Sequence, residues 1–348
     1  MYVNDQSFIL QDDATILDVI ANLNETGYLI CIVTDSSNKL LGTITDGDIR
    51  RGLLAGKSLS DLAIAIIISN PVTSQLGASD EHNKNLIKRH QVKQIPIIDD
   101  QHHIHALYIW DDNDRGEARE NPILIMAGGF GKRMMPLTND IPKPMLKIAG
   151  KPMLEHIICS ARAQGFKSFF ISLHYLGDQI IDYFGDGSNW DVEINYIQED
   201  KPLGTAGCMT LFNERPKLPF IVTNGDLYSD INFSAILDFH ISNDADATMA
   251  IKQQQLRNPF GVVKTDGLKI IAIEEKPINI SYINSGVYII SPKMLETLER
   301  NQYCDMPNFF LDLRDRDKKI IAFPIHESWE DIGKPIDLNK LNQHHSYD

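Results

Sequence analysis

The stretch LIMAGGFGKRMMPLTNDIPKPMLKIAGKP, residues 124–152, determines how the rest of the chain is interpreted. An apolar run with strand character leads into Gly128, Gly129 and Gly131. Glycines let a backbone approach a phosphate closely and aim its N–H groups at it. Arg133 follows the last glycine, and its guanidinium can hold two phosphate oxygens at once. The stretch therefore predicts a strand that ends in a phosphate-binding loop.

Two common glycine-loop patterns do not describe this stretch. The Walker A pattern needs Ser or Thr after Gly-Lys, but Arg133 follows Lys132. The dinucleotide pattern GxGxxG fails because Met134 stands at the last glycine position. Lys143 lies between two prolines, which restrict its backbone and so fix where this second cation points. A tight turn that merely begins a helix is the alternative for the glycines alone, and the combined spacing favours the phosphate loop.

Strands and helices alternate over residues 122–348. The runs ILIMAGG, SFFISLH, EINYIQE, PFIVTNG, DATMAIK and YINSGVYII have strand character. PMLEHIICSARAQ is predicted to be an amphipathic helix that buries Leu154, Ile157, Ile158 and Ala161. Such alternation predicts an α/β domain, a mostly parallel sheet with helices on both faces. Ligands of these sheets bind at the carboxyl ends of the strands.

A polar segment separates this domain from an N-terminal one. Residues 113–121 are almost wholly polar or charged and are predicted to be a linker. Residues 1–112 contain an internal repeat, with copies at about 1–60 and 61–112, each with the order strand, helix, strand, strand. A unit of this size cannot bury its sheet alone, so the two copies are expected to pack together.

The second domain resembles the sugar-1-phosphate nucleotidyltransferase family. The glycine stretch resembles the signature of that family, and six further motifs follow in the family's order: KPLGTAGCM at 201–209, VTNGDLY at 222–228, NPFGVV at 258–263, IEEKP at 273–277, INSGVY at 283–288 and WEDIGKP at 329–335. The resemblance covers residues 122–338 and implies a Rossmann-like fold. The chain departs from the family at Lys132, where many members carry Thr.

The resemblance implies a role for each motif. Arg133 and Lys143 would be catalytic, and Asp226 and Asp331 would hold Mg²⁺. The NTP would be bound by Ala127, Gly128, Gly129, Gly131, Gln198, Gly204 and Thr205. The sugar and its phosphate would be bound by Gly261, Glu275, Lys276 and Asn284. Purely structural roles remain alternatives for three of these residues: Asp226 could lie in a turn, Asp331 could cap the following turn, and Lys276 could be a solvated surface lysine.

The N-terminal repeat resembles a tandem CBS domain. LLGTITDGDIR, residues 40–50, matches the second strand and helix start of that family. The resemblance implies that Thr45 and Asp48 bind an adenine nucleotide, AMP or ATP, at a helix N-terminus. The second copy has Ile109 in place of Thr45 and retains an aspartate, Asp112. A purely structural or dimerising CBS pair is the equal alternative.

Together the two resemblances imply a regulated enzyme of nucleotide-sugar biosynthesis. It would join a sugar 1-phosphate to an NTP and release pyrophosphate; similarity to CBS-fused guanylyltransferases favours GTP with mannose, glucosamine or a related sugar. The alternatives are a dTTP-, UTP- or CTP-dependent pyrophosphorylase, a phospho-amino-alcohol cytidylyltransferase and a non-catalytic nucleotide sensor. We expect a homo-dimer or higher oligomer.

Bulk properties exclude some partners. The chain has 348 residues and a net charge of −14, which argues against nucleic acid and anionic membranes because both need basic surface. No basic segment followed by a long apolar one begins the chain, and no apolar run approaches the length of a membrane helix. The expected location is the cytoplasm.

Overall fold

The structure is a computed structural model that describes residues 2–90, 92–109 and 118–344. It divides the chain into two compact units, Met1–Asp114 and Arg115–Asp348. The described residues contain no helix with the length and apolar character needed to cross a membrane. Asp112 and most of the predicted linker lie outside the described residues. Arg119 already belongs to the second unit, because its guanidinium binds Asp238 at 2.7 and 3.0 Å.

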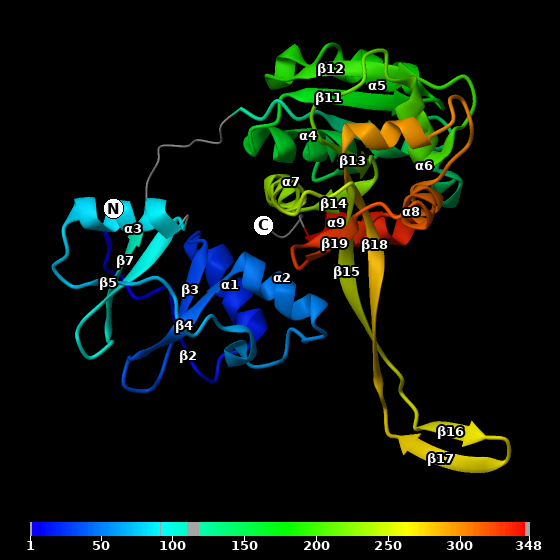
Figure 1. The fold of residues 1–348 in the computed structure, drawn as a ribbon. Coiled ribbons are helices and arrows are strands. Elements are labelled where there is room, and N and C mark those ends of the chain that lie inside the picture. The colour runs from blue at the N-terminus through cyan, green and yellow to red at the C-terminus, as the bar shows by residue number, and fades with distance from the viewer. Residues whose placement is uncertain (1, 91, 110–117, 345–348) are drawn as a thin grey trace. The chain divides into compact units, whose positions relative to one another are not determined.

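The first unit contains two copies of one topology (Figure 1). The first copy is β2 (Ile9–Gln11), α1 (Ile16–Thr26), β3 (Ile30–Thr34), β4 (Leu40–Thr45) and α2 (Asp46–Leu54). The second is β5 (Ser74–Gln75), α3 (Asp80–His90), β6 (Gln94–Ile98) and β7 (Ile104–Ile109), joined by β1 (Tyr2–Val3). In both, the first strand runs parallel to the second and the second antiparallel to the third. The predicted CBS fold is confirmed.

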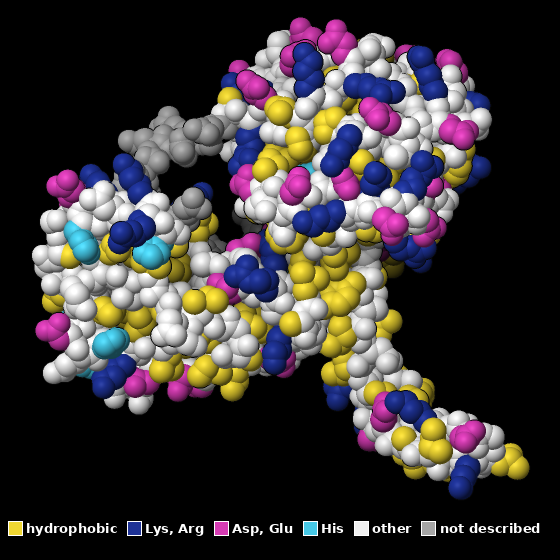
Figure 2. All heavy atoms as spheres, in the orientation of Figure 1, with side chains coloured by type: hydrophobic (Ala, Val, Ile, Leu, Met, Phe, Trp, Pro, Cys, Tyr) yellow, Lys and Arg dark blue, Asp and Glu magenta, His cyan; other side chains and the backbone are white. Residues whose placement is uncertain are grey.

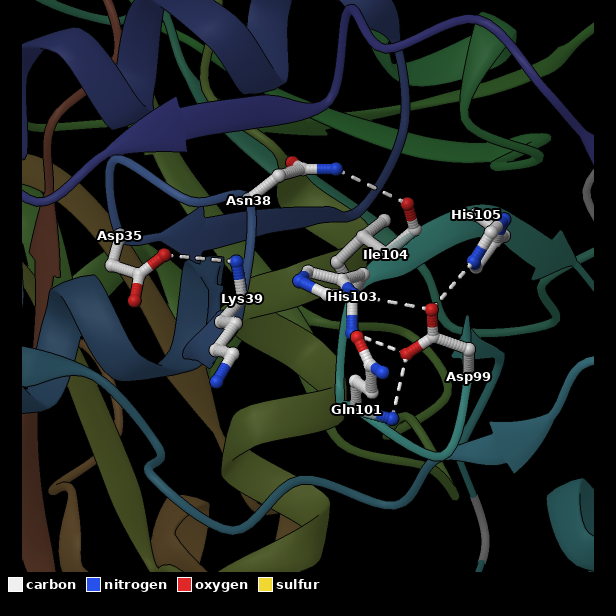
Figure 3. Close-up of polar contacts among 8 residues, drawn as sticks. All are labelled: Asp35, Asn38, Lys39, Asp99, Gln101, His103, Ile104 and His105. Atoms are coloured by element: carbon white, nitrogen blue, oxygen red, sulfur yellow. Dashed lines mark hydrogen bonds and ion pairs between the residues drawn. The ribbon is translucent and has the colours of Figure 1, made fainter.

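The two copies meet at equivalent turns (Figure 3). In each turn an aspartate, Asp35 or Asp99, accepts hydrogen bonds from the backbone N–H groups two and four positions later. The turns are then cross-linked: Ile104 N donates to Asn38 O at 3.3 Å, and Asn38 Nδ2 donates to Ile104 O at 3.3 Å. The repeat in the sequence therefore corresponds to a pseudo-symmetric pair.

The second unit is built on a seven-stranded sheet in the order β12-β11-β8-β13-β18-β15-β19. These strands are β8 (Ile123–Met126), β11 (Ser168–Leu173), β12 (Glu193–Gln198), β13 (Phe220–Asn224), β15 (Ala247–Arg257), β18 (Ile278–Ile290) and β19 (Ile320–Ile325). Only β18 runs against the others in this sheet. The predicted mostly parallel α/β fold is confirmed.

Helices cover both faces of this sheet because its strands are apolar on both sides. In β8, Ile123 and Ile125 enter one core cluster, whereas Leu124 enters the other. The first cluster includes α4 (Met153–Ala163), α5 (Gly177–Phe184) and α7 (Phe233–Ser242); the second includes α6 (Gly204–Gly207) and α8 (Met306–Asp315). The four apolar residues predicted for one face of α4 all lie in the first cluster. α9 (Pro335–His344) and the short ladder of β9 (Lys147–Ile148) with β10 (Lys151–Pro152) complete this part.

One segment projects away from the sheet. β15 and β18 stay paired past the last rung of their neighbours, from Gln253 opposite Tyr282 to Arg257 opposite Ile278. Beyond them, β16 (Val262–Asp266) and β17 (Lys269–Glu274) form a hairpin. We call residues 253–282 the arm. Figure 1 shows it as a long yellow ribbon with β16 and β17 at its far end.

Candidate active site

A cavity of about 530 Å³ opens where β8 and β13 end. The parallel strands end at this edge, so their following loops converge there. Glycine-loop residues line it together with the 199–208 segment, Asn224 and Asp226. Of the residues predicted to bind the NTP, those lining it are Ala127, Gly128, Gly129, Gly131, Gly204 and Thr205; Arg133 and Lys143 line it too. One cavity therefore brings together most of the residues that were predicted to bind the NTP.

The glycine loop has two positions where an added Cβ atom would be crowded. Gly131 has φ 61° and ends the loop at the start of a 3₁₀ turn, η2 (Lys132–Met134). A Cβ atom there would lie 3.0 Å from Thr138 Cγ2 and 3.2 Å from Lys143 Cβ. A Cβ atom at Gly128 would lie 3.1 Å from Glu199 Oε1. The glycines thus keep the backbone against the cavity wall, with space for a ligand beside it.

The cavity combines cations with carboxylates. Lys143, at the start of η3 (Lys143–Met145), is buried, and its ammonium donates to Asp226 Oδ2. Lys132 and Arg133 add two further charges to the lining, and the Arg133 side chain is exposed. A triphosphate needs such charge, since charge-assisted hydrogen bonds to phosphate are the strong ones. Lys143 is the cation that the fold itself holds in place.

The second predicted metal ligand is brought close by a short ladder. β14 (Leu227–Ser229) pairs with β20 (Trp329–Asp331), and Leu227 lies opposite Asp331. Asp226 directly precedes this rung. The pKa of Asp331 is raised by desolvation and by the nearby Asp226 carboxylate, although its surface is exposed to solvent. The two aspartates predicted from distant motifs are therefore electrostatic neighbours.

The segment after β12 is anchored to the chain near residue 305. Gly204 has φ 77°, and a Cβ atom there would lie 2.6 Å from Cys304 O. Thr205 Oγ1 accepts from Met306 N at 2.7 Å, while Thr205 N donates to Asp305 Oδ1 at 3.2 Å. Tyr303, which is largely exposed, lines the cavity beside this segment. The loop predicted to contact the nucleotide is thus bound on one side to residues 304–306, and its other side faces the cavity.

Gln198 was predicted to bind the nucleotide, whereas its neighbour Glu199 was not predicted as a site residue. Gln198 is exposed and is not among the described residues that line the cavity, whereas Glu199 is buried and lines it. The Glu199 carboxylate accepts from Ser172 Oγ and, at 2.9 Å, from Leu203 N. Simple alternation along the strand does not give this result, because Ile194 and Ile197, three positions apart, are both buried and belong to different core clusters.

The four sugar-phosphate residues lie outside the described lining of this cavity. Gly261, Glu275 and Lys276 meet on the arm, where a Cβ atom at Gly261 would lie 3.0 Å from Glu275 Oε2 and Lys276 has φ 47°. Asn284 lies at the base of the arm, and its Nδ2 donates to Tyr288 Oη at 2.7 Å. The structure brings three of the four together on the arm, outside the described lining of this cavity.

Thr45 and Asp48 lie at the start of α2 in the first unit and bind one another. Asp48 Oδ2 accepts from Thr45 N at 2.8 Å and from Thr45 Oγ1 at 2.7 Å, and Asp48 Oδ1 accepts from Arg51 at 2.5 Å. Asp48 is buried. This is a capping box of the kind that stabilises a helix start. Both carboxylate oxygens already have partners within the domain.

Comparisons with known proteins fit this architecture. The family model described as nucleotidyl transferase matches residues 123–346, and the CBS domain model matches residues 2–55. A mannose-1-phosphate guanyltransferase of Yarrowia lipolytica is 31% identical over 223 residues, covering 62% of this chain and 61% of that enzyme. A D-glycero-alpha-D-manno-heptose 1-phosphate guanylyltransferase of Aneurinibacillus thermoaerophilus is 32% identical over 222 residues, covering 63% of this chain and 96% of that enzyme.

A solved structure adds the spatial match. The crystal structure of HddC from Yersinia pseudotuberculosis superposes with a TM-score of 0.50 at 29% identity, covering 64% of this chain and 99% of HddC. The chain spans only part of the Yarrowia enzyme and nearly all of HddC. The family model covers more than half of the chain, and the cavity has the glycine loop and cations that nucleotidyl transfer needs; the chain therefore belongs to the nucleotidyl transferase family, with a CBS domain in its N-terminal unit.

Proposed function

We propose that this protein transfers a guanylyl group from GTP to the 1-phosphate of mannose or a related hexose or heptose, releasing pyrophosphate. The observation that carries the proposal is the cavity itself. It combines a glycine loop, Arg133, Lys143 and Asp226 with the buried carboxylate of Glu199. Guanylyltransferases among the relatives, including one of nearly the same length as the second unit, support the choice of substrates.

The chemistry follows from positioned charge. An oxygen of the sugar phosphate attacks the α-phosphorus of GTP in line, a new P–O bond forms, and the bond to the β-phosphate oxygen breaks so that pyrophosphate leaves. No covalent intermediate with the protein is needed, because positioning and neutralisation of charge suffice. Arg133 holds the β- and γ-phosphates. Lys143 neutralises the α-phosphate as charge builds there.

The ion pair between Lys143 and Asp226 stabilises both side chains before substrate binds. While no phosphate is bound, each neutralises the other. When the α-phosphate arrives, the Lys143 ammonium can turn to it, and the Asp226 carboxylate is released for another cation. The pair thus holds both groups in place before the substrate enters.

The carboxylates fit a magnesium site of the kind that substrates complete. Mg²⁺ is usually bound by one or two carboxylates plus phosphate oxygens and water. Asp226 and Asp331 supply two carboxylates, and the charge of Asp226 contributes to the raised pKa of Asp331. Within the described residues no cluster of three or more His, Cys, Asp or Glu forms a metal cage. When bound, the ion would add positive charge at the reacting phosphates.

Glu199 supports the preference for guanine. Glu199 is 7% exposed and lines the cavity, and its carboxylate accepts one hydrogen bond from a hydroxyl and one from a backbone N–H. An ionised carboxylate only accepts hydrogen bonds. The N1–H and the N2 amino group of guanine are adjacent donors and can both bind one carboxylate. Adenine and cytosine present an acceptor where guanine presents N1–H, so this acceptor would disfavour them.

The test is a pyrophosphate-release screen of purified enzyme. GTP, ATP, UTP, CTP and dTTP are paired with mannose, glucosamine, glucose and manno-heptose 1-phosphates and with a phosphorylated amino alcohol, with Mg²⁺ and after chelation. We expect release with GTP and a manno-configured sugar, and loss of it in Asp226→Asn. Activity only with dTTP, UTP or CTP would contradict the choice of GTP and identify the protein as the corresponding pyrophosphorylase. Nucleotide binding without turnover would favour the sensor.

The CBS domain is proposed as a regulatory site for AMP or ATP at Thr45 and Asp48. Its support is the match to the CBS family and the position of both residues at a helix start, where backbone N–H groups favour phosphate. The capping box competes with this role, since a ribose would have to share Asp48 with Thr45 and Arg51.

A further inference from the structure

The second unit contains another cavity, of about 280 Å³, lined by residues of η5 (Cys208–Leu211) and η6 (Pro292–Thr297) and of the chain that follows each. Phe212 lines it and is fixed by edge-to-face contacts with Phe170 and Phe220, at 5.0 and 5.5 Å between ring centroids. Three further apolar side chains of the lining belong to the second core cluster or pack against it: Met209, Leu295 and Leu298. The cavity therefore has an apolar lining that the core holds in place.

Two arginines give this second cavity a local positive charge. Arg215 and Arg300 line it, are exposed to solvent, and have no hydrogen-bond or ion-pair partner among the residues that the structure describes. Their neighbours in the sequence, Glu214 and Glu299, lie outside its described lining. The chain has a net charge of −14, and Figure 2 shows Asp and Glu interspersed with Lys and Arg over the visible face of the second unit. Guanidinium groups bind phosphate oxygens bidentately, so two unpaired arginines in an acidic protein favour a phosphate here.

The second cavity is directly connected to the nucleotide cavity. Segment 300–305 contributes to both, because Arg300 lines the second cavity and Tyr303 lines the nucleotide cavity. Segment 204–210 also contributes to both, since Thr205 and Thr210 line different cavities. Three hydrogen bonds join the two segments: Asn301 N to Thr210 Oγ1 at 3.3 Å, Ala206 N to Cys304 O at 2.8 Å and Gly207 N to Cys304 O at 3.0 Å. A ligand that shifts either segment in the second cavity therefore acts on the lining of the nucleotide cavity.

We propose that the second cavity binds a small phosphomonoester and that its occupancy changes the affinity of the nucleotide cavity. Arg215 and Arg300 hold the phosphate, and the apolar lining around Phe212 contacts the organic part. The volume is close to the lower end of the range of about 300–1,000 Å³ that is typical of small-molecule sites, which suits a compact ligand. The inference goes beyond the proposed function, because this site is separate from the reacting phosphates and does not depend on which NTP is used.

Methionine methyl groups report on the two cavities separately. Met209 lines the second cavity, whereas Met126 and Met134 line the nucleotide cavity. Full-length protein with ¹³C-labelled methionine methyl groups is titrated with phenyl phosphate, and the Met209 signal is assigned by its loss in Met209→Leu. We expect a saturable shift of the Met209 signal. Phenol and inorganic phosphate should each bind more weakly, because each offers only one part of the proposed ligand. No shift at millimolar phenyl phosphate, or a shift at Met126 and Met134 alone, would overturn the site.

Substitution of the arginines tests which groups hold the phosphate. Arg215→Gln and Arg300→Gln should each lower the affinity measured at Met209 roughly 10-fold, the loss expected for one hydrogen bond to a charged group. Lys217→Gln is the matched control, because Lys217 is an exposed cation close in sequence that lies outside the described lining. It should bind phenyl phosphate as the wild type does. An equal loss in Lys217→Gln, or no loss in the arginine variants, would contradict the assignment.

The coupling is measured by titrating GTP at the Met126 signal with and without saturating phenyl phosphate. The apparent affinity for GTP should change by about 5-fold or more in the wild type, and GTP should change the affinity for phenyl phosphate at Met209 by the same factor. Neither change should occur in Arg300→Gln. An unchanged affinity in the wild type, or the same change in Arg300→Gln, would overturn the coupling. An enzyme inactive with every substrate pair would defeat the proposed function instead, and the Met209 titration would still decide the second site.

Discussion

Glu199 is the residue on which the nucleotide preference depends. Glu199→Gln keeps the size of the side chain and one acceptor oxygen, which can accept from Leu203 N while the amide NH2 donates to Ser172 Oγ, but it removes the carboxylate that faces the cavity. A hydrogen bond to a charged group contributes roughly 1.5–3 kcal/mol, which corresponds to about 10- to 100-fold. We expect kcat/KM for GTP to fall by that factor. Discrimination against ITP, which lacks the N2 amino group, should weaken.

Gln198→Ala is the matched control for this prediction. Gln198 is the adjacent residue, is exposed and lies outside the described cavity lining. Its truncation should leave kcat/KM for GTP and the GTP-to-ITP ratio unchanged. If Gln198→Ala rather than Glu199→Gln altered the ratio, the base would have to bind at the outward side of the strand.

His240 links stability of the second unit to pH. Its ring is buried between Thr248 Oγ1 at 2.9 Å and Ser291 Oγ at 3.0 Å, and burial lowers its pKa to about 4. The unfolded chain, with a pKa near 6.5, binds the proton more readily, so folding stability is full above pH 6.5 and falls as the pH drops towards 4. This one group should cost about 2 kcal/mol between pH 7 and pH 5. Urea unfolding should show a smaller loss over that range in His240→Gln; an equal loss in both proteins would contradict the assignment.

At the scale of elements, the two ends of the glycine loop have different reasons for glycine. Gly131 combines φ 61° with close contacts, so Gly131→Ala should destabilise the second unit by roughly 1–3 kcal/mol. A Cβ atom added at Gly129 would meet no described atom within 4 Å, and the φ of Gly129 is not positive. Gly129→Ala should therefore leave unfolding unchanged and raise KM for the NTP, because only the phosphates approach there. Thermal unfolding and steady-state kinetics of both variants separate these effects, and equal destabilisation would refute the distinction.

The elements themselves could largely be predicted from the sequence, because local patterns determine them. Apolar runs indicated β8 and its neighbours, and the period of apolar residues indicated α4 with its buried face. The inward direction of Glu199 could not be predicted from alternation, because the buried side of β12 changes between Ile194 and Ile197. The direction of the arm could not be predicted. It depends on where the β15–β18 ladder outlasts its neighbours, a contact between distant segments that no local pattern encodes.

The proximity of Asp226 and Asp331 could be predicted only in part from the sequence. Motif order suggested both residues, yet more than 100 positions separate them. Only the pairing of β14 with β20 places Leu227 opposite Asp331 and so brings the carboxylates together. The residue types indicated two candidate metal ligands, whereas their proximity depends on the pairing of β14 with β20 in the tertiary fold.

At the scale of the whole molecule, the proposed regulation of catalysis by the CBS unit requires a ligand. A ligand can regulate the enzyme only if it prefers one arrangement of the two units, and such coupling is typically about 1–3 kcal/mol. A purely structural CBS pair would show no such preference. The first CBS copy contains a matched control that distinguishes a ligand-sensing CBS pair from a purely structural one. Thr15 and Asp18 form the same capping box at α1 that Thr45 and Asp48 form at α2.

Calorimetry of the full chain with AMP and ATP should therefore show binding that Asp48→Ala abolishes and Asp18→Ala preserves. Both substitutions remove one capping carboxylate and should cost a similar amount, about 1 kcal/mol, of local stability. Only Asp48 is buried beside the proposed ribose position, whereas Asp18 is exposed. Equal loss of binding in both variants would mean that the cap, not a contact with the nucleotide, was responsible. Absence of heat at millimolar nucleotide in the wild type would leave the CBS pair as a structural unit. A pyrophosphate-release rate indifferent to a nucleotide that does bind would remove regulation while keeping the site.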